Sequence, residues 1–333
     1  MNSGFSIETD ASRRQTLAAA KQAALQAMRQ YELDWNAIRF IQVSEHVTFR
    51  IEVGEKESYL LRIHPGSKPR PEIASELEWL AALKRKGLMI PEAVANRDGA
   101  FLTDASTHGG QQLTATVLTW IEGEQGGRGA LTEEAARAMG ALMAKLHEAS
   151  ADFQPSAHFS RPAWGLDSFR RDWAHLKRHH RPFISEEAMA LYVKAADQVE
   201  AALAALSGQT QNYGMIHADL HIGNVVFREN EPYPIDFGRC GYGYHLYDMA
   251  QAIMGMPPAH RASFLAGYEE ARPLEDAAIS KLESFLIMAI IESYSFHAEN
   301  PLETAGLIEE QPYAEALLNA YVNGAPFLFE SVE

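Results

Sequence analysis

The chain has 333 residues, of which 47% are hydrophobic, enough for a sizeable core and for more than one compact lobe. Its formal net charge of −15 would repel a phosphate backbone, so we expect no nucleic-acid partner. The lone cysteine, Cys240, excludes an internal disulfide and a four-cysteine metal site, and it favours the cytoplasm over an oxidising compartment.

The amino-terminal segment predicts an ordinary helix over residues 12–31. Basic residues interrupt its alanine-rich run and leave no apolar core of the kind that a secretory signal has. The most apolar later stretch, residues 285–291, is far shorter than the about 18 residues that a membrane span needs. We therefore expect a buried helix there and no membrane partner.

A β-rich lobe is expected next. Residues 40–53 and 58–63 are rich in Val, Ile, Phe, Thr and Tyr, and the turn-forming residues 54–57 between them predict a β-hairpin. After a proline-rich loop, apolar residues at helical spacing predict a helix over residues 72–86, closed by Gly87. Further strands are expected over residues 93–96, 99–103 and 114–120.

A change of pattern near residues 120–129, where glycines are frequent, marks the boundary to a second lobe. Thr132 caps the start of a long helix that reaches His147, and helical periodicity dominates most of the remaining chain. We therefore predict an α+β fold with two lobes. Residues 1–120 hold the amino-terminal helix and a small antiparallel sheet with one main helix, and residues 121–333 form a larger, mostly helical lobe.

The most informative segments are His217-Ala218-Asp219-Leu220-His221-Ile222-Gly223-Asn224 and, further on, Ile235-Asp236-Phe237-Gly238. Phosphoryl transfer from a metal-bound nucleotide requires a carboxylate at the acceptor hydroxyl and hard oxygen ligands for Mg²⁺. Asp219 fits the first role, and Asn224 and Asp236 fit the second.

The spacing of these segments is consistent with one shared site. Residues 225–227 and 233–235 predict two short strands, and Asn230 with its acidic neighbours predicts the turn between them. Such a hairpin would bring Asp236 back opposite Asn224, where both side chains can share one ion.

The order of these polar residues resembles the catalytic and metal-binding segments of the protein-kinase-like superfamily. Its small-molecule branch fits best, on the form His-Ala-Asp-Leu-His-x-Gly-Asn and on the later run Gly241-Tyr242-Gly243-Tyr244-His245-Leu246-Tyr247-Asp248-Met249-Ala250. The chain is thus similar to the aminoglycoside phosphotransferase and choline kinase-like family, which includes homoserine-kinase-like and fructosamine-kinase-like enzymes. The resemblance implies a bilobal protein-kinase-like fold, Mg²⁺, ATP or GTP as donor, and an aminoglycoside, amino alcohol, homoserine-like or sugar-derived acceptor.

The phosphate anchor is expected in the first lobe. The resemblance places Arg62 where protein kinases have a strand lysine, and its planar guanidinium can grip phosphate, although a solvent-facing Arg at a strand edge is the alternative. Glu76 shares the apolar stripe of its helix, so it should face the sheet and pair with Arg62. Glu78 is the competing choice.

The rest of the nucleotide site is expected around two loops. Residues 44–49 should cover the phosphates but contain no glycine, so Ser44 and Thr48 are candidate contacts and a plain hairpin turn is the alternative. Backbone groups of residues 118–121, Trp120 among them, would hold the adenine edge as the hinge does in kinases.

Other polar residues are expected to support the site. The resemblance implies that Asp248 organises the catalytic loop, and His217 should hold the same loop through hydrogen bonds, with a general-base role as the alternative. Adjacent His179 and His180 point in different directions on a helix, which argues against a metal-binding pair. Residues 158–183 predict either helical packing with a solvated basic face or a wall of the acceptor pocket.

Two rival functions use the same residues. A protein serine/threonine kinase is disfavoured by Ala218, where protein kinases commonly carry Arg, and by the lack of an Ala-Pro-Glu-like segment. A non-catalytic nucleotide-binding or scaffold protein is disfavoured because Asp219, Asn224 and Asp236 are all present. The sequence leaves open the acceptor, the choice of ATP or GTP, and the oligomeric state.

Overall fold

The computed structural model describes residue 5 and residues 9–107, 109–127, 129, 131–275 and 277–330, so residues 1–4 of the amino-terminal segment lie outside the described residues. The chain forms two compact units. Unit 1 comprises Met1–Glu122 and Gln154–Arg161, and unit 2 comprises Gly123–Phe153 and Pro162–Glu333. Within the described part of the chain, we find no helix that combines the length and the hydropathy needed to cross a bilayer.

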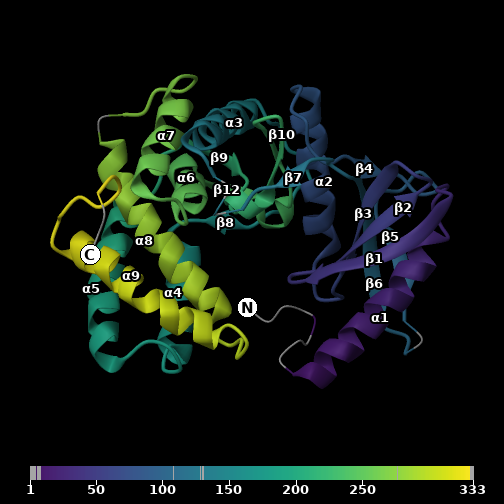
Figure 1. Cartoon of the computed structure of the whole chain (residues 1–333), viewed down its shortest axis with the longest axis horizontal. Helices are drawn as coiled ribbons and strands as arrows, with labels where there is room; N and C mark the ends of the chain where they lie inside the picture. Colours follow the sequence, from purple (N-terminus) through teal and green to yellow (C-terminus); the bar gives the residue numbers. More distant parts are fainter. Residues whose placement is uncertain are drawn as a thin grey trace. The chain divides into compact units, whose positions relative to one another are not determined.

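Unit 1 is built on an antiparallel sheet with the strand order β1-β2-β3-β6-β4, and β5 also pairs with β6 (Figure 1). The strands are β1 (Trp35–Val43), β2 (Val47–Val53), β3 (Glu57–His64), β4 (Ala93–Val94), β5 (Thr103–Ser106) and β6 (Gln112–Thr119). The hairpin predicted around residues 54–57 is confirmed by the pairing of β2 with β3. A second turn, at residues 44–46, divides the segment 40–53 between β1 and β2.

A helix lies on each face of this sheet, and the sequence predicted both helices. The alanine-rich side of α1 (Asp10–Met28) packs with Leu61 and Ile63 in one apolar cluster. Alternate residues of a strand face opposite sides, so Arg62 points away from α1, and it contacts α2 (Arg70–Arg85). Both helices begin and end within a few residues of their predicted limits.

The strand expected over residues 99–103 is wrong, because β5 begins only at Thr103. Asn96 causes the shift: its Oδ1 accepts hydrogen bonds from the backbone N–H groups of Asp98 and Ala100, both at 3.0 Å. This side chain holds the chain in a turn, so the apolar residues that follow lie in a loop.

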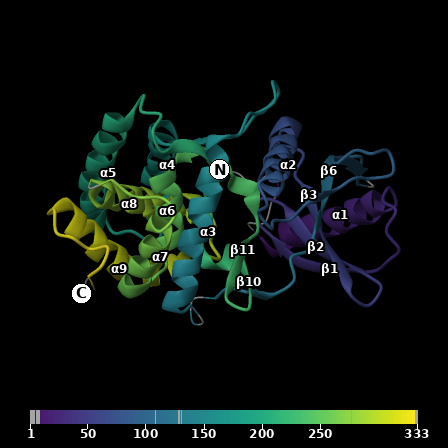
Figure 2. The same cartoon turned by 90° about the horizontal axis from the view of Figure 1, so that it is seen from above.

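Unit 2 is mostly helical, as predicted, and α3 lies beside α7 in both views (Figures 1 and 2). Its helices are α3 (Glu133–Ala151), α4 (Leu166–His179), α5 (Glu186–Leu206), α6 (His245–Ile253), α7 (Pro258–Glu269), α8 (Ala278–His297) and α9 (Thr304–Val322). The cap predicted at Thr132 is confirmed, since its hydroxyl accepts a hydrogen bond from the Ala135 N–H at 3.1 Å. Residues 285–291 are buried inside α8, also as predicted.

Two small sheets in unit 2 position the polar loops. One contains β7 (Glu124–Gln125), β10 (Val225–Arg228) and β11 (Glu231–Pro234), and the other contains β8 (Ala163–Trp164), β9 (Tyr213–Ile216) and β12 (Gly241–Tyr244). The antiparallel pair of β9 and β12 places the residue that follows Ile216 near the buried Cys240, which precedes β12. The second of these sheets was not anticipated from the sequence.

Candidate active site

The β10–β11 hairpin brings two of the predicted metal ligands to neighbouring positions. Its turn uses Glu229 and Asn230, whose positive φ values of 50° and 70° match the tight two-residue turn that follows the twist of the strands. Beyond the last strand pair, the Ile235 N–H donates to the Asn224 carbonyl at 2.9 Å. Asp236 is the next residue, so its backbone lies one position beyond the residue that stands opposite Asn224.

Asn224 is buried and joined to Asp219 by two hydrogen bonds. Its Nδ2 donates to the Asp219 backbone carbonyl at 2.9 Å and to the Asp219 Oδ2 at 3.1 Å. These bonds use the amide nitrogen, so Oδ1 is the atom that would hold a metal ion. A hard oxygen beside two carboxylates is the donor set that Mg²⁺ prefers, so the residues fit this ion.

The backbone at Asp236 is left-handed, with φ 59° and ψ 66°, and Ala218 also has a positive φ of 63°. A residue with a Cβ pays an energetic cost of about 1–2 kcal/mol for this conformation. Such strain persists only where the surroundings hold it, and it is concentrated at functional sites. Both residues lie in the two segments that the sequence singled out.

Asp248, the first-turn acid of α6, anchors the segment before Asp219. Its fully buried carboxylate accepts hydrogen bonds from the backbone N–H groups of His217 at 3.0 Å and Ala218 at 2.7 Å. Burial raises the pKa of Asp248, while these donors and the neighbouring His217 act to lower it. The organising role predicted for Asp248 is confirmed.

Two further residues, which were not predicted from the sequence, support Asp248. His147 of α3 lies 3.0 Å from an Asp248 oxygen through Nε2 and 2.9 Å from the Tyr268 hydroxyl through Nδ1. Burial lowers the pKa of His147 well below its usual value, so the neutral ring donates from Nε2 to the carboxylate and accepts from Tyr268 at Nδ1. One sign of this role was visible in the sequence, because His147 lies on the apolar face of a predicted helix.

The His217 ring holds the loop through a hydrogen bond. Its Nε2 lies 3.0 Å from the Ile235 carbonyl, which can only accept, so Nε2 carries the proton. Burial lowers the pKa of His217, although the Asp248 carboxylate acts in the opposite direction. The ring therefore ties the segment before Asp219 to the residue before Asp236.

In unit 1, Arg62 and Glu76 form the predicted ion pair. The Arg62 Nη1 donates to the Glu76 Oε1 at 2.7 Å, and both side chains are almost completely buried. Burial acts to raise the pKa of Glu76, but the Arg62 guanidinium, together with Arg161, outweighs it and holds the pKa below its usual value. Glu78 instead accepts hydrogen bonds from Ser156, so Glu76 is the partner.

The same guanidinium retains unused donors. Among the described residues, the buried Nε and Nη2 atoms of Arg62 have no hydrogen-bond partner. Buried donors are normally paired, because an unpaired one costs about 1–3 kcal/mol. Two donors on the same edge of a planar guanidinium are the pair that grips a phosphate group with two parallel bonds.

The remaining nucleotide candidates lie near the ends of strands. Ser44 lies in the tight turn between β1 and β2, whereas Thr48 is a buried strand residue whose hydroxyl donates to the Gln42 carbonyl at 3.2 Å. The loop expected through residue 49 is therefore shorter, because β2 begins at Val47. Trp120 follows β6 and packs under the Arg50 guanidinium, 4.8 Å from the ring centre.

Residues 158–183 show the packing pattern predicted for them. Phe169 and Trp173 of α4 are buried, and the basic side chains Arg170, Arg171, Lys177 and Arg178 are exposed. Trp164 of β8 donates from its ring nitrogen to the Arg239 carbonyl at 3.1 Å, and the Arg239 guanidinium lies over the same ring. This contact connects the segment to the residues that follow Asp236.

Comparison with known proteins identifies the family. A model of the phosphotransferase enzyme family matches residues 37–279, well over half of the chain. The amicoumacin kinase of Bacillus subtilis (strain 168) is 21% identical over 323 residues, which cover 92% of this chain and 93% of the relative. A homoserine kinase of Beijerinckia indica subsp. indica is 29% identical over 237 residues, which cover 67% of this chain and 68% of the relative.

Solved structures share the fold. The microcompartment-associated aminopropanol kinase is similar with a TM-score of 0.79 and 25% identity, covering 92% of this chain and 98% of that one. The amicoumacin kinase hAmiN, in complex with AMP-PNP, Ca²⁺ and Ami, has a TM-score of 0.76 and 17% identity, covering 94% and 96%. The α+β, protein-kinase-like fold is confirmed, and this chain belongs to the phosphotransferase enzyme family as a small-molecule phosphotransferase.

Proposed function

We propose that this enzyme transfers the terminal phosphate of a Mg²⁺-bound nucleoside triphosphate, ATP or GTP, to an alcohol group of a small molecule in the cytoplasm. The observation that carries the proposal is the buried Asn224 amide, which is hydrogen-bonded to Asp219 and stands beside Asp236. The loop and the hairpin would thus hold the Asp219 carboxylate close to the proposed metal ligands, Asn224 and Asp236. Phosphoryl transfer requires such positioning.

Each residue has a distinct role in this proposal. Asp219 orients the acceptor alcohol and takes its proton as the new P–O bond forms. The Asn224 Oδ1 and the Asp236 carboxylate hold Mg²⁺, which neutralises phosphate charge when bound. Arg62, held by Glu76, donates from its unpaired N–H groups to phosphate oxygens.

We propose that three further residues help to bind the nucleotide: Ser44, Thr48 and Trp120. The backbone of Ser44, in its three-residue turn, is proposed to approach the phosphates, and Thr48 to shape that turn through its bond to Gln42. The backbone beside Trp120 is proposed to hold the adenine or guanine edge. No residue of this turn has a positive φ, so the turn does not require glycine.

A compact amino alcohol is the first acceptor class that we propose. Aminopropanol and homoserine, the compounds named for two of the relatives, each combine an amine with an alcohol. Residues 158–183 and the helices that follow are the candidate wall of the acceptor pocket. Aminoglycosides, choline and sugar-derived alcohols form the comparison panel.

The proposal is tested by Asp219→Asn, which removes the charge and keeps the shape. Turnover on the best acceptor of the panel should fall by about 10²–10⁴-fold, because the positioned base is lost. Binding of Mg-nucleotide should persist. Phosphate transfer is followed by the low-mass phosphorylated product and by nucleoside diphosphate release.

The matched control is Asp197→Asn, the same chemical change at an exposed site on α5. It should leave turnover unchanged. Full turnover of the Asp219→Asn enzyme on a proven acceptor would contradict the assignment.

A further inference from the structure

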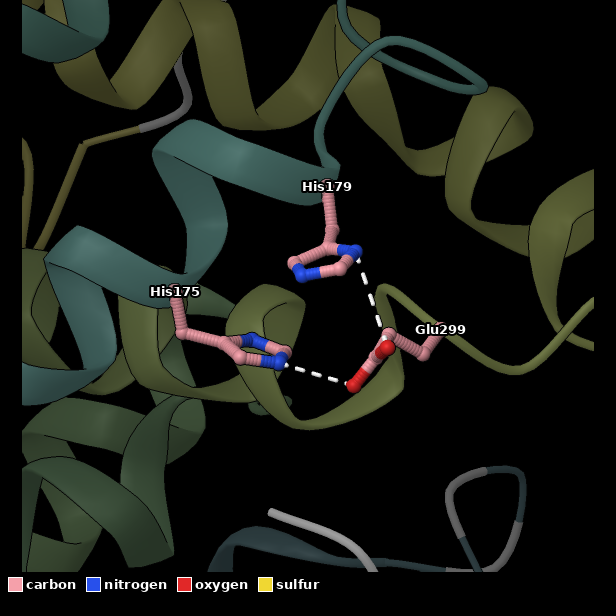
Figure 3. Close-up of side chains that lie close together, drawn as sticks. All are labelled: His175, His179 and Glu299. Carbon is pink, nitrogen blue, oxygen red and sulfur yellow. Dashed lines mark hydrogen bonds and ion pairs between the residues drawn. The ribbon is translucent and has the colours of Figure 1, made fainter.

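A second cluster of metal-ligating side chains lies in unit 2, in residues that the phosphotransfer proposal does not use. His175 and His179 are separated by one turn of α4, and Glu299 follows the end of α8 (Figure 3). Figure 3 shows both imidazole rings directed toward the same carboxylate. One ligand atom of each residue lies within 4.8 Å of the others.

The distances are close to those of a tetrahedral zinc site. The His175 Nε2 lies 3.0 Å from one Glu299 oxygen, and the His179 Nδ1 lies 3.7 Å from the other. Two ligand atoms at about 2.1 Å from a tetrahedral Zn²⁺ are about 3.4 Å apart, so the observed distances lie on either side of that value. Small rotamer changes would let all three residues reach one ion.

The sequence spacing supports the same chemistry. Histidines four residues apart lie on one face of a helix and form the paired ligands of known zinc-binding helices, with a carboxylate from elsewhere as the third. The adjacent His180 does not take part, because it is buried and its Nδ1 lies 3.0 Å from the Lys177 carbonyl. The two histidines that share a helix face are thus His175 and His179, and the adjacent His179 and His180 do not form a pair.

The surroundings orient the first ligand. The Ser295 hydroxyl lies 3.3 Å from the His175 Nδ1, on the far side of the ring from Glu299. A metal-bound histidine usually donates its other ring N–H to such a partner, which fixes the ring orientation. Ser295 is buried in α8, against which α4 packs, so the cluster stands on two helices in contact.

We infer that His175, His179 and Glu299 bind one divalent transition-metal ion, Zn²⁺ by preference, with a fourth position for water. Two imidazoles favour Zn²⁺ over Mg²⁺ and Ca²⁺, which take oxygen ligands. The ion connects α4 to the chain between α8 and α9. It stabilises unit 2 and is separate in sequence and chemistry from the Asp219, Asn224 and Asp236 set.

The test is calorimetric titration of ZnCl₂ into the untagged, metal-stripped full chain in the presence of excess MgCl₂, which saturates the oxygen-ligand site. We expect one zinc per chain and a higher Tm when zinc is bound, because the ion binds only the folded arrangement. His179→Gln and Glu299→Gln should each weaken binding by more than about 100-fold, since even outer-shell partners account for about 10–100-fold.

Two controls use exposed residues of the same types. His158→Gln and Glu309→Gln change an exposed histidine and an exposed glutamate outside the cluster and should bind zinc like the natural chain. Absence of zinc binding by the natural chain would overturn the inference and leave a histidine–glutamate ion pair. Binding that persists unchanged in both His179→Gln and Glu299→Gln would overturn it as well.

Discussion

Asp236 and Ala218 share a backbone conformation that side chains rarely adopt, with φ values of 59° and 63°. At Ala218 the strain is held by the 2.7 Å hydrogen bond from its N–H to Asp248. Asp236 directly follows Ile235, whose carbonyl accepts from His217 and whose N–H donates to the Asn224 carbonyl. Hydrogen bonds therefore hold the backbone at or next to both residues, which is how strain is maintained at functional sites.

Glu292 is a buried acid of α8 whose charge state should control stability. The Tyr247 hydroxyl donates to it at 2.6 Å, and Ser168 lies within 3.4 Å of its other oxygen. Burial, with a smaller contribution from Asp172, raises the pKa of Glu292 to about 7. Burial therefore favours the neutral acid.

The sign of the resulting pH dependence follows from proton binding. Between the usual carboxyl pKa of about 4.3 and the folded value of about 7, the folded chain binds a proton that the unfolded chain lacks. The contribution of Glu292 to the free energy of unfolding should therefore decrease with rising pH, by about 1.4 kcal/mol per unit, and level off above that window. Denaturant unfolding from pH 5 to 8 measures it.

Glu292→Gln should remove this part of the pH dependence, because the amide resembles the protonated acid and does not titrate. Glu310→Gln, at an exposed position on α9, is the control and should keep the slope of the natural chain. An unchanged slope in Glu292→Gln would show that the acid is already ionised in the folded chain at pH 5.

At the scale of elements, α3 and α7 approach so closely that glycine is required at the contact. A Cβ at Gly140 would overlap the Phe264 carbonyl, and one at Gly267 would overlap the Arg137 carbonyl. The obstacle in each case is backbone, which cannot rotate away as a side chain can. α3 also carries His147 and α7 carries Tyr268, so their spacing supports the Asp248 anchor.

Gly140→Ala should lower the free energy of unfolding by about 1–3 kcal/mol through overpacking. It should also lower kcat, since the displaced helix moves His147 relative to Asp248. Gly306→Ala, in an open part of α9, is the matched control. It should raise stability by about 0.5 kcal/mol, because alanine restricts the unfolded chain. Equal effects of the two substitutions would contradict the close-contact argument.

Local features of the fold were predictable, and long-range ones were not. The helix over residues 132–147 carried its own cap, and the β10–β11 turn carried its own turn residues, so each was visible within a short window. The prediction of a strand over residues 99–103 was wrong because the Asn96 side chain accepts hydrogen bonds from the backbone of the residues that follow it. The apolar composition of the segment gives no sign of these bonds.

The residues of the candidate site also fall into a local group, which was predictable, and a long-range group, which was not. Asp219, Asn224 and Asp236 lie within one short stretch of chain, so their grouping was visible in the sequence. The contact of His147 with Asp248 joins residues 101 positions apart and depends on the packing of α3, which no local pattern reveals. The His175–Glu299 contact spans 124 positions and was missed for the same reason.

At the scale of the whole molecule, the proposal predicts that nucleotide binding depends on Mg²⁺, which Asn224 and Asp236 would hold. Calorimetric titration of ATP and GTP, with and without Mg²⁺, should show metal-dependent binding to the natural chain and identify the preferred donor. Asp236→Asn should weaken that binding at least tenfold, about 1.4 kcal/mol, because one charged metal ligand is lost.

Asp197→Asn serves again as the control and should bind nucleotide like the natural chain. Equal binding with and without Mg²⁺, or equal binding by Asp236→Asn, would remove Asp236 from the metal site. Absence of nucleotide binding by the natural chain would instead favour a scaffold role for the molecule.

The single cysteine of the chain gives this molecule a built-in chemical reporter. Cys240 is completely buried and lies four residues after Asp236, just before β12. A thiol reagent can reach it only when this segment opens, so the rate of labelling measures the opening of the segment itself. Because the sequence contains no other thiol, those kinetics can be followed in the natural chain, with each substrate in turn, without an introduced label site.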